Sequence, residues 1–367
     1  MKQIFLLAAL VLTTSCVDLS SKENKDDKEV SERRYWRQKP GLMYGAIDSV
    51  TITNYKVSDK FGEVVKNYVK SKSVYKFNQK GDVVEDVFYN CDGSLKCKIL
   101  YKYDSQGNIN EKAEYKGDGV LNWKHLYKYD SNGNKIEEAK YKGDGSLLTK
   151  YLAKYDLQGN KIEEATYVGP YFLQEKYHYK YDSHGNEIEM TRYNGRDSLN
   201  WKKISKYNSQ DNKIESALYN SDGSLSRKQF YKYNSQGNKI EEAWYNSNSS
   251  LEFIIKYDLH GNKIEEAQYK GDGSLLTKYL YKYDSQGKLI ETEEYCADET
   301  CLISKYLYKY DSLDNTIEYA RYNSDGSLNY KGVYKYDYQG NEIEEIVYND
   351  EIMKPVEMEE REIVYRK

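Results

Sequence analysis

The strongest constraint on this chain is an internal repeat of about 26 residues that begins at Phe77 and continues almost to the C-terminus. Successive copies are 26 residues apart, except for 24 residues before Tyr257 and 27 before Tyr310. The chain therefore contains eleven copies of one supersecondary unit, and we assign residues 77–350 to this array. The anchor aromatic residues of the copies are Phe77, Tyr103, Tyr129, Tyr155, Tyr181, Tyr207, Tyr233, Tyr257, Tyr283, Tyr310 and Tyr336.

Each unit carries two turn motifs, which divide it into two strands. Asp130 and Asn220 suit the first position of a type I turn. Gly133 and Gly223, three residues later, supply the positive φ of a G1 bulge in a hairpin loop. Eleven units then predict about 22 strands, and 42 tyrosines against three prolines favour strands over helices.

The simplest register continues both strands directly from the turn at 130–134, so that Tyr127 lies opposite Glu137. This register predicts that aromatic side chains share one face of the sheet, although neither face is fully apolar. Which face is buried stays open. The same count places two tryptophans opposite tyrosines, Trp123 opposite Tyr141 and Trp201 opposite Tyr219.

The expected fold is all-β, an extended antiparallel array of β-hairpins. Open sheets of more than about ten strands rarely stay flat, and strands twist with a fixed hand. We therefore expect the array to coil into a superhelical or solenoid-like sheet. Residues 35–76 and 351–367 depart from the repeat pattern and are predicted to be the N-terminal and C-terminal caps that protect its open edges.

The motif Tyr-Asp-x-x-Gly-Asn, as in residues 129–134 and 181–186, resembles the YD repeat of RHS-type proteins. That resemblance implies hairpins wound into a spiral shell or strip. It also implies a role as a scaffold, an encapsulating wall or a carbohydrate-contacting surface rather than as an enzyme. The unit is longer here, and the chain lacks the large C-terminal core and the toxin-like cargo segments of that family.

The N-terminus has the order of a secretory signal peptide: Lys2, an apolar run over residues 4–12, and small residues up to Cys16. We assign residues 1–15 to the signal peptide. The cysteine resembles that of the lipobox of bacterial lipoproteins, where it is acylated and becomes the first mature residue. The alternative is an ordinary signal peptide with an incidental cysteine. On the first interpretation, the lipid anchor is the only contact with the membrane.

Residues 16–34 are densely charged and are predicted to be a flexible tether behind the lipidated cysteine. The acidic stretch also resembles the surface-export signals of Bacteroidetes lipoproteins, although short charged tethers occur for solvation alone. The expected location is the bacterial cell envelope, at the outer membrane and exposed on the surface. A periplasmic orientation is the alternative.

Charge and residue distribution argue against several function classes. Interleaved basic and acidic residues, 55 and 59 in number, leave no basic stripe for nucleic acid. The four histidines, His125, His178, His184 and His260, occupy different repeat positions and have no metal-ligand spacing. We therefore expect no enzymatic activity, no metal site and no cofactor.

Two recurrent acidic patterns have plain structural explanations. Adjacent glutamates such as Glu137 and Glu138 point to opposite faces of a strand, so they favour salt bridges over the paired carboxylates of a glycosidase. Turn aspartates such as Asp130 and Asp144 suit Asx hydrogen bonds, with calcium binding as the alternative.

The aromatic face is the best candidate for ligand binding, because tyrosine and tryptophan combine flat apolar surface with a hydrogen-bond donor. The expected function is a scaffold for adhesion or for binding glycan or protein at the cell surface. The alternative is a purely structural envelope spacer without a specific ligand. The candidate binding residues are Trp123, Tyr127, Tyr129, Tyr141, Trp201 and Tyr219.

The four remaining cysteines flank second turns and are predicted to form local disulfides, which an oxidising compartment permits. Cys296 and Cys301 border a turn one residue longer than usual, so their Cβ atoms should lie on facing strand ends. Cys91 lies within its turn and Cys97 lies on the following strand, which makes that bridge the less secure of the two.

Overall fold

The computed structural model describes residues 43–297, 300–349 and 353–366. Two units are separated by their internal contacts, Met1–Met43 and Tyr44–Lys367, and the fold described here is that of the second. The predicted signal peptide, Cys16 and the tether lie outside the described residues. No helix of the described part is long and apolar enough to cross a membrane.

The described chain is all-β, as predicted, and consists of 24 strands in one antiparallel sheet. In chain order they are β1 (Ile47–Lys60), β2 (Glu63–Phe77), β3 (Val83–Tyr89), β4 (Leu95–Tyr103), β5 (Ile109–Lys116), β6 (Leu121–Tyr129), β7 (Lys135–Lys142), β8 (Leu147–Tyr155), β9 (Lys161–Val168), β10 (Phe172–Tyr181), β11 (Glu187–Asn194) and β12 (Leu199–Tyr207). They continue as β13 (Lys213–Asn220), β14 (Leu225–Tyr233), β15 (Lys239–Asn246), β16 (Leu251–Tyr257), β17 (Lys263–Tyr269), β18 (Leu275–Tyr283), β19 (Leu289–Tyr295), β20 (Leu302–Tyr310), β21 (Thr316–Asn323), β22 (Leu328–Tyr336), β23 (Glu342–Asn349) and β24 (Lys354–Tyr365).

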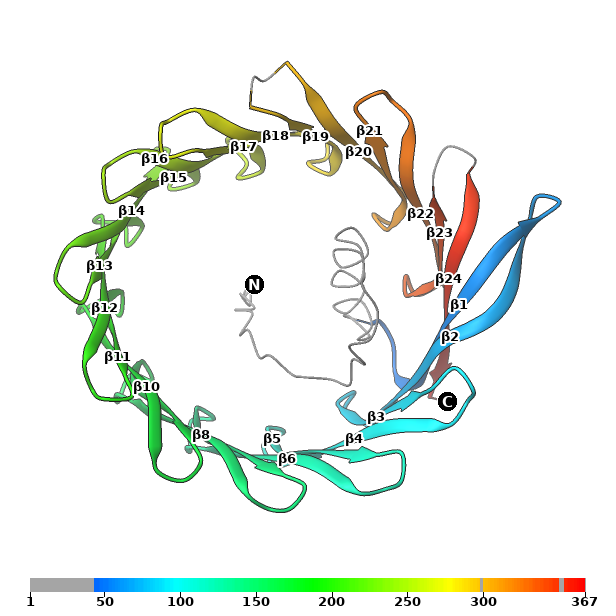
Figure 1. Ribbon diagram of the computed structural model, residues 1–367, viewed down its shortest axis with the longest axis horizontal. Coiled ribbons are helices and arrows are strands. Elements are labelled where there is room, and N and C mark those ends of the chain that lie inside the picture. Colours follow the sequence, from blue (N-terminus) through cyan, green and yellow to red (C-terminus); the bar gives the residue numbers. More distant parts are fainter. Residues whose placement is uncertain (1–42, 298–299, 350–352, 367) are drawn as a thin grey trace. The chain divides into compact units, whose positions relative to one another are not determined.

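The sheet closes on itself, which corrects the expectation of a superhelical or solenoid-like array of about 22 strands. Each strand pairs with the next along the chain, and β1 also pairs with β24, with Ser49 opposite Val364 and Thr53 opposite Glu360. Figure 1 shows the strands following one another around a ring, with β1 beside β24. The segments predicted as caps thus pair with each other and leave the sheet without an open edge.

Closure places the most apolar cluster at this seam. Val57 of β1, Ile346 of β23 and Met358 of β24 are buried together, with partly buried apolar side chains around them. Elsewhere both faces are mostly half-buried. An eight-stranded barrel is just wide enough for its side chains to fill, so a closed sheet of 24 strands is a wall with two accessible faces.

Both turn motifs adopt the predicted geometry. At the first turn, the Gly133 N–H donates to the Asp130 carbonyl at 3.1 Å, and Gly133 has a φ of 84°. At the second turn, the Gly223 N–H donates to the Asn220 carbonyl at 3.0 Å. The positive φ explains why glycine recurs at these positions.

The register is offset by one residue from the predicted one. Tyr129 does lie opposite Lys135, but Lys128 lies opposite Glu137, so Ile136 is an extra residue that forms a β-bulge. Tyr127 consequently lies opposite Glu138 instead of Glu137. A bulge of the same kind follows the second turn, where Tyr141 lies opposite Leu147 and Lys140 opposite Thr149. Beyond each bulge, the residues of one strand therefore share a face with different partners from those predicted.

Candidate functional site

The two faces of the sheet carry different chemistry. One, here called the ladder face, holds Lys128 on β6 and its partner Glu137 on β7. The other, here called the aromatic face, holds Trp123 and Tyr127 on β6 and the Tyr127 partner Glu138 on β7. The two members of each Glu-Glu pair therefore serve different faces, as alternation along a strand predicts.

The ladder face is built from lysine and glutamate around a small buried residue. Glu189 illustrates this, with its carboxylate 2.8 Å from the Lys180 Nζ and 2.6 Å from the Lys202 Nζ. A buried alanine recurs beside these pairs, and Ala139 and Ala267 are examples. The face is thus charge-paired, and the predicted salt bridges explain the first glutamate of each pair.

On the aromatic face, the second tyrosine of the Tyr-x-Tyr motif clamps neighbouring strands together. The Tyr129 O–H, at the end of β6, donates to the carbonyl of Ile109 at the start of β5, at 2.9 Å. Each such bond joins the two strands of one hairpin at the end away from its turn, and contributes about 1 kcal/mol to the free energy of unfolding. Within the described part of the chain, nine tyrosines make this contact with the strand before their own: Tyr103, Tyr129, Tyr155, Tyr181, Tyr207, Tyr233, Tyr283, Tyr310 and Tyr336.

The first tyrosine of the motif joins a network around the second glutamate. The Glu164 carboxylate accepts a hydrogen bond at 2.6 Å from the hydroxyl of Tyr179, the first tyrosine of its motif. It also accepts hydrogen bonds from the Tyr151 hydroxyl at 2.6 Å and from the Lys161 Nζ at 2.7 Å. Burial alone would raise the pKa of Glu164, but these donors lower it. The sheet itself therefore favours the ionised form of Glu164.

Glu138 is the most strongly perturbed carboxylate of this network. Burial raises its pKa, but hydrogen bonds from His125 and Lys135 outweigh that effect and lower the pKa to about 2. The Glu138 oxygens lie 3.2 Å from the His125 Nδ1 and 2.6 Å from the Lys135 Nζ. Burial and the nearby Glu138 charge also raise the pKa of Tyr127.

Aromatic clusters recur along the same face near the second turns. The ring centroids of Trp123 and His125 are 4.8 Å apart, and those of Tyr177 and Trp201 are 6.0 Å apart. Trp244 and Phe253 form a third cluster at 4.7 Å, which the sequence-based prediction missed because the bulges had not been placed. Three tyrosines on consecutive strands form a fourth: Tyr306, Tyr319 and Tyr330.

The structure separates the six predicted binding residues into two groups. Trp123, Tyr127, Tyr129 and Trp201 lie on the aromatic face. Tyr141 lies opposite Lys124 and Tyr219 opposite Lys202, so both belong to the ladder face and neither pairs with a tryptophan. A ligand on one face therefore contacts at most four of the six.

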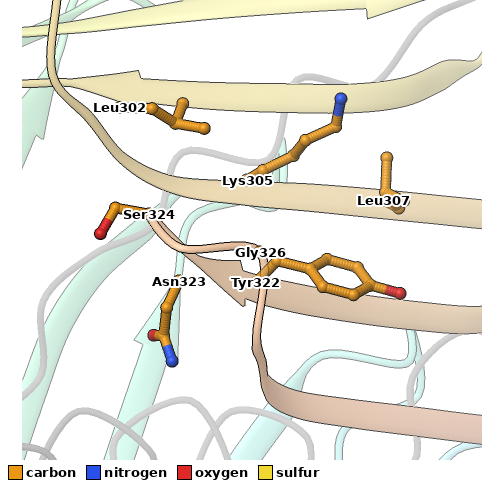
Figure 2. A pocket seen from close by; sticks show the side chains of 7 residues that line it. All are labelled: Leu302, Lys305, Leu307, Tyr322, Asn323, Ser324 and Gly326. Atoms are coloured by element: carbon orange, nitrogen blue, oxygen red, sulfur yellow. The ribbon is translucent and has the colours of Figure 1, made fainter.

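One shallow hollow of about 240 Å³ lies on the ladder face. Leu302, Lys305 and Leu307 of β20 line it together with Tyr322 and the turn that follows (Figure 2). The same residue types recur at the same repeat positions, as in Leu147, Lys150, Leu152 and Tyr167. Its volume is below that of usual ligand pockets, so the hollow itself gives no support for a ligand site.

The turn aspartates make the predicted Asx hydrogen bonds. The Asp130 Oδ1 accepts the N–H groups of Asn132 and Asn134, each at 2.9 Å. A side-chain hydrogen bond from Asn134 and these backbone donors lower the pKa of Asp130. Among the described residues, no three His, Cys, Asp or Glu side chains lie where they could hold a metal ion.

The four cysteines lie at or beside the two predicted turns. The Cys296 N–H donates to the Cys301 carbonyl at 2.9 Å, so their backbones face each other across the turn. Cys91 is exposed in its turn, whereas Cys97 is buried on β4 opposite Phe88. Both disulfides stay predictions.

Comparison with known proteins identifies no family for the whole chain. A family model described as "Uncharacterised protein" matches residues 206–313. No curated protein matches the chain in sequence.

Solved structures resemble the chain only weakly. The TcdB2-TccC3 structure is 11% identical with a TM-score of 0.35, and 79% of this chain matches 20% of that one. A Photorhabdus luminescens Tc holotoxin pore is 12% identical with a TM-score of 0.34, over 78% of this chain and 19% of that one. A porin-like protein from Bacteroides uniformis is 8% identical with a TM-score of 0.21, over 88% of this chain and all of that one. The chain spans about a fifth of the toxin-complex chains that it matches.

Proposed function

We propose that this chain is a non-enzymatic lipoprotein of the bacterial cell envelope, anchored through Cys16, whose closed repeat sheet is a scaffold for glycan or protein ligands at the surface. The YD-like motif at residues 129–134, the charged tether and the signal sequence support this proposal. The observation that carries it is the set of aromatic clusters on one face.

These clusters are not required by the fold. The second tyrosine of the Tyr-x-Tyr motif recurs with little variation, as expected of a residue that holds neighbouring strands together. The position of Trp123, in contrast, holds threonine in two other repeats, at Thr149 and Thr277. Aromatic side chains at a position that tolerates threonine are better explained by a ligand, because flat, half-exposed rings suit stacking against sugars and protein surfaces.

The rival function is an envelope spacer without a specific ligand. The tyrosine hydroxyls that donate to backbone carbonyls favour it, since they show that part of the tyrosine content is structural. The two proposals differ in whether the aromatic clusters bind anything.

Binding tests separate them. The full chain, purified in a polyoxyethylene detergent that carries no sugar, is applied to a glycan array and used in pull-downs from envelope extracts. We expect specific ligands, and we expect the triple variant Trp123→Leu, Trp201→Leu, Trp244→Leu to lose at least about tenfold in affinity. A matched triple variant of the ladder face, Tyr115→Leu, Tyr167→Leu, Tyr269→Leu, should keep its binding. No specific ligand, or equal losses in both variants, would favour the spacer.

The anchor is tested separately. Acylation of Cys16 should place the wild type in the detergent phase of a phase-separation assay, and Cys16→Ala should move the protein to the aqueous phase. If both proteins stay in the aqueous phase, the cysteine is not lipidated.

A further inference from the structure

The turns of the closed sheet form two rims. Neighbouring strands are antiparallel, so the first turns lie at one rim and the second turns at the other. These rims are here called the first-turn rim and the second-turn rim. In the first turn at 156–160, residues 157–159 are exposed, whereas Asp156 and Asn160 are partly buried. The exposed middle residues of each turn, its tip, therefore determine what a rim contacts.

The tips of the first-turn rim carry little charge. Most copies hold uncharged residues there, such as Ser-Gln-Gly at 105–107 and 235–237. The charged exceptions are Lys80, Asp211 and Asp314, and both aspartates are bonded to side chains of the preceding turn. This rim is therefore able to approach an apolar phase without desolvating many charges.

The tips of the second-turn rim are acidic. Aspartate recurs there, as at Asp144, Asp222 and Asp325, and these side chains are exposed. Hydrogen bonds from the serine two residues later lower the pKa of each of the three, so their carboxylates are ionised at neutral pH. Placing them against hydrocarbon would cost their solvation. The second-turn rim thus suits water.

Within the described part of the chain, four first-turn tips expose large apolar side chains. Leu157 is 99% exposed, Tyr338 84%, Leu313 71% and Leu259 69%. Other copies hold serine or another polar residue at these positions, so the turn itself does not require an apolar side chain there.

Exposed apolar side chains alone do not select a rim, since the second-turn rim exposes Phe61 and Tyr171. The charge of the tips and the point of attachment do. The Tyr44 N–H donates to the Asn341 Oδ1 at 2.7 Å, and the Asn341 Nδ2 donates to the Tyr44 carbonyl at 2.9 Å. Asn341 ends a first turn, so the chain enters the sheet at the first-turn rim. A lipid anchor at Cys16 therefore holds the sheet from this side.

We propose that the first-turn rim docks on the lipid bilayer that holds the anchor, with its apolar tips among the headgroups and the acidic second-turn rim directed away. Burial of the apolar tips adds to the affinity of the anchor, and the uncharged tips beside them lose little solvation. The docking rests on the proposed anchor at Cys16 and goes beyond it, because it fixes the orientation of the strands on the membrane. It also adds a second membrane contact to the one that the sequence predicts.

Fluorescence quenching in vesicles tests this orientation. Ser235 and Ser247 are exposed in the turns at the two ends of β15, a strand of 8 residues that spans about 26 Å. The lipidated full chain with Ser235→Trp or Ser247→Trp is reconstituted into phosphatidylcholine vesicles whose acyl chains carry bromine, a quencher of tryptophan. The native tryptophans are common to both variants. We expect the added fluorescence of Ser235→Trp to be quenched at least about twofold more strongly than that of Ser247→Trp.

Two matched variants show whether the apolar tips cause the docking. The first-turn variant introduces residue types that other copies hold at the same positions: Leu157→Ser, Leu259→Ser, Leu313→Gln and Tyr338→Ser. The second-turn variant removes exposed apolar side chains from the opposite rim: Phe61→Asn, Val120→Ser, Tyr171→Ser and Phe172→Ser. The first should abolish the extra quenching of Ser235→Trp, and the second should leave it unchanged. Thermal melting checks that both variants fold.

The outcomes separate the docking from the anchor and from ligand binding. If the chain does not float with the vesicles, the anchor is wrong and the docking falls with it. If it floats but both reporters are quenched equally, or Ser247→Trp is quenched more, the anchor stands and the docking is overturned. A first-turn variant that keeps the difference, or a second-turn variant that loses it, also overturns the proposal. The array and pull-down results decide the binding scaffold independently.

Discussion

Removing the last strand is expected to open the sheet and to make the protein self-associate. β24 pairs with both β23 and β1, so deletion of residues 353–367 leaves two long strands with unpaired N–H and C=O groups. Such edges are templates for pairing with another chain. The deletion also removes Met358, which is buried with Val57 and Ile346 at the seam.

Size-exclusion chromatography with light scattering measures this effect. The deleted chain should appear as dimers and larger species, whereas the full chain should not. The matched control keeps β24 but removes two seam salt bridges, through Glu357→Gln and Glu360→Gln, whose partners are Lys70 and Lys66. These pairs are partly exposed and each contributes at most about 1 kcal/mol, so the control should stay monomeric. A deleted chain that remains monomeric would show that closure does not depend on β24.

Closure illustrates what the sequence could not predict. The repeat spacing and the Asp-x-x-Gly turns predict the strands correctly, because each hairpin is set by local turn chemistry. The pairing of β1 with β24 joins segments that depart from the repeat and lie about 300 residues apart. No local pattern encodes such a contact, so an open coil was the natural expectation.

The register error has an equally specific cause. The bulge at Ile136 adds one residue that the spacing of Asp130 and Asn134 does not reveal. One residue exchanges the faces of a strand, so Tyr141 was wrongly paired with Trp123. Trp123 itself was identified from its chemistry, but its neighbours Lys112 and Lys140 become visible only in the correct register.

The recurrence of the second tyrosine in the Tyr-x-Tyr motif indicates a structural role for that residue. A hydroxyl kept at nearly every copy, as at Tyr129, indicates a bond to the repeat itself, and the structure shows that bond to the Ile109 carbonyl. The position of Trp123 varies between copies, which indicates that the fold does not require an aromatic residue there. Comparing the copies position by position separates structural from candidate functional aromatic residues better than their abundance does.

Two second turns of identical sequence should respond differently to the same substitution. Lys-Gly-Asp-Gly-Ser-Leu occurs at residues 142–147 and again at 270–275. At Gly143 an added Cβ would lie 2.0 Å from the Leu121 carbonyl oxygen, a backbone atom that cannot move alone. At Gly271 an added Cβ would meet nothing within 4 Å, in a turn whose preceding repeat is two residues shorter.

Gly143→Ala must therefore displace the turn or the start of β6, and we expect it to destabilise the protein by about 2 kcal/mol or more. Gly271→Ala meets no such contact and restricts the unfolded chain, so it should be neutral or stabilising by about 0.5 kcal/mol. Urea denaturation of the two single variants and the wild type measures both effects. Because the two turns share their local sequence, intrinsic turn preference would shift both midpoints equally. Equal shifts would mean that the approach of the 142–146 turn to the Leu121 carbonyl does not constrain the sheet.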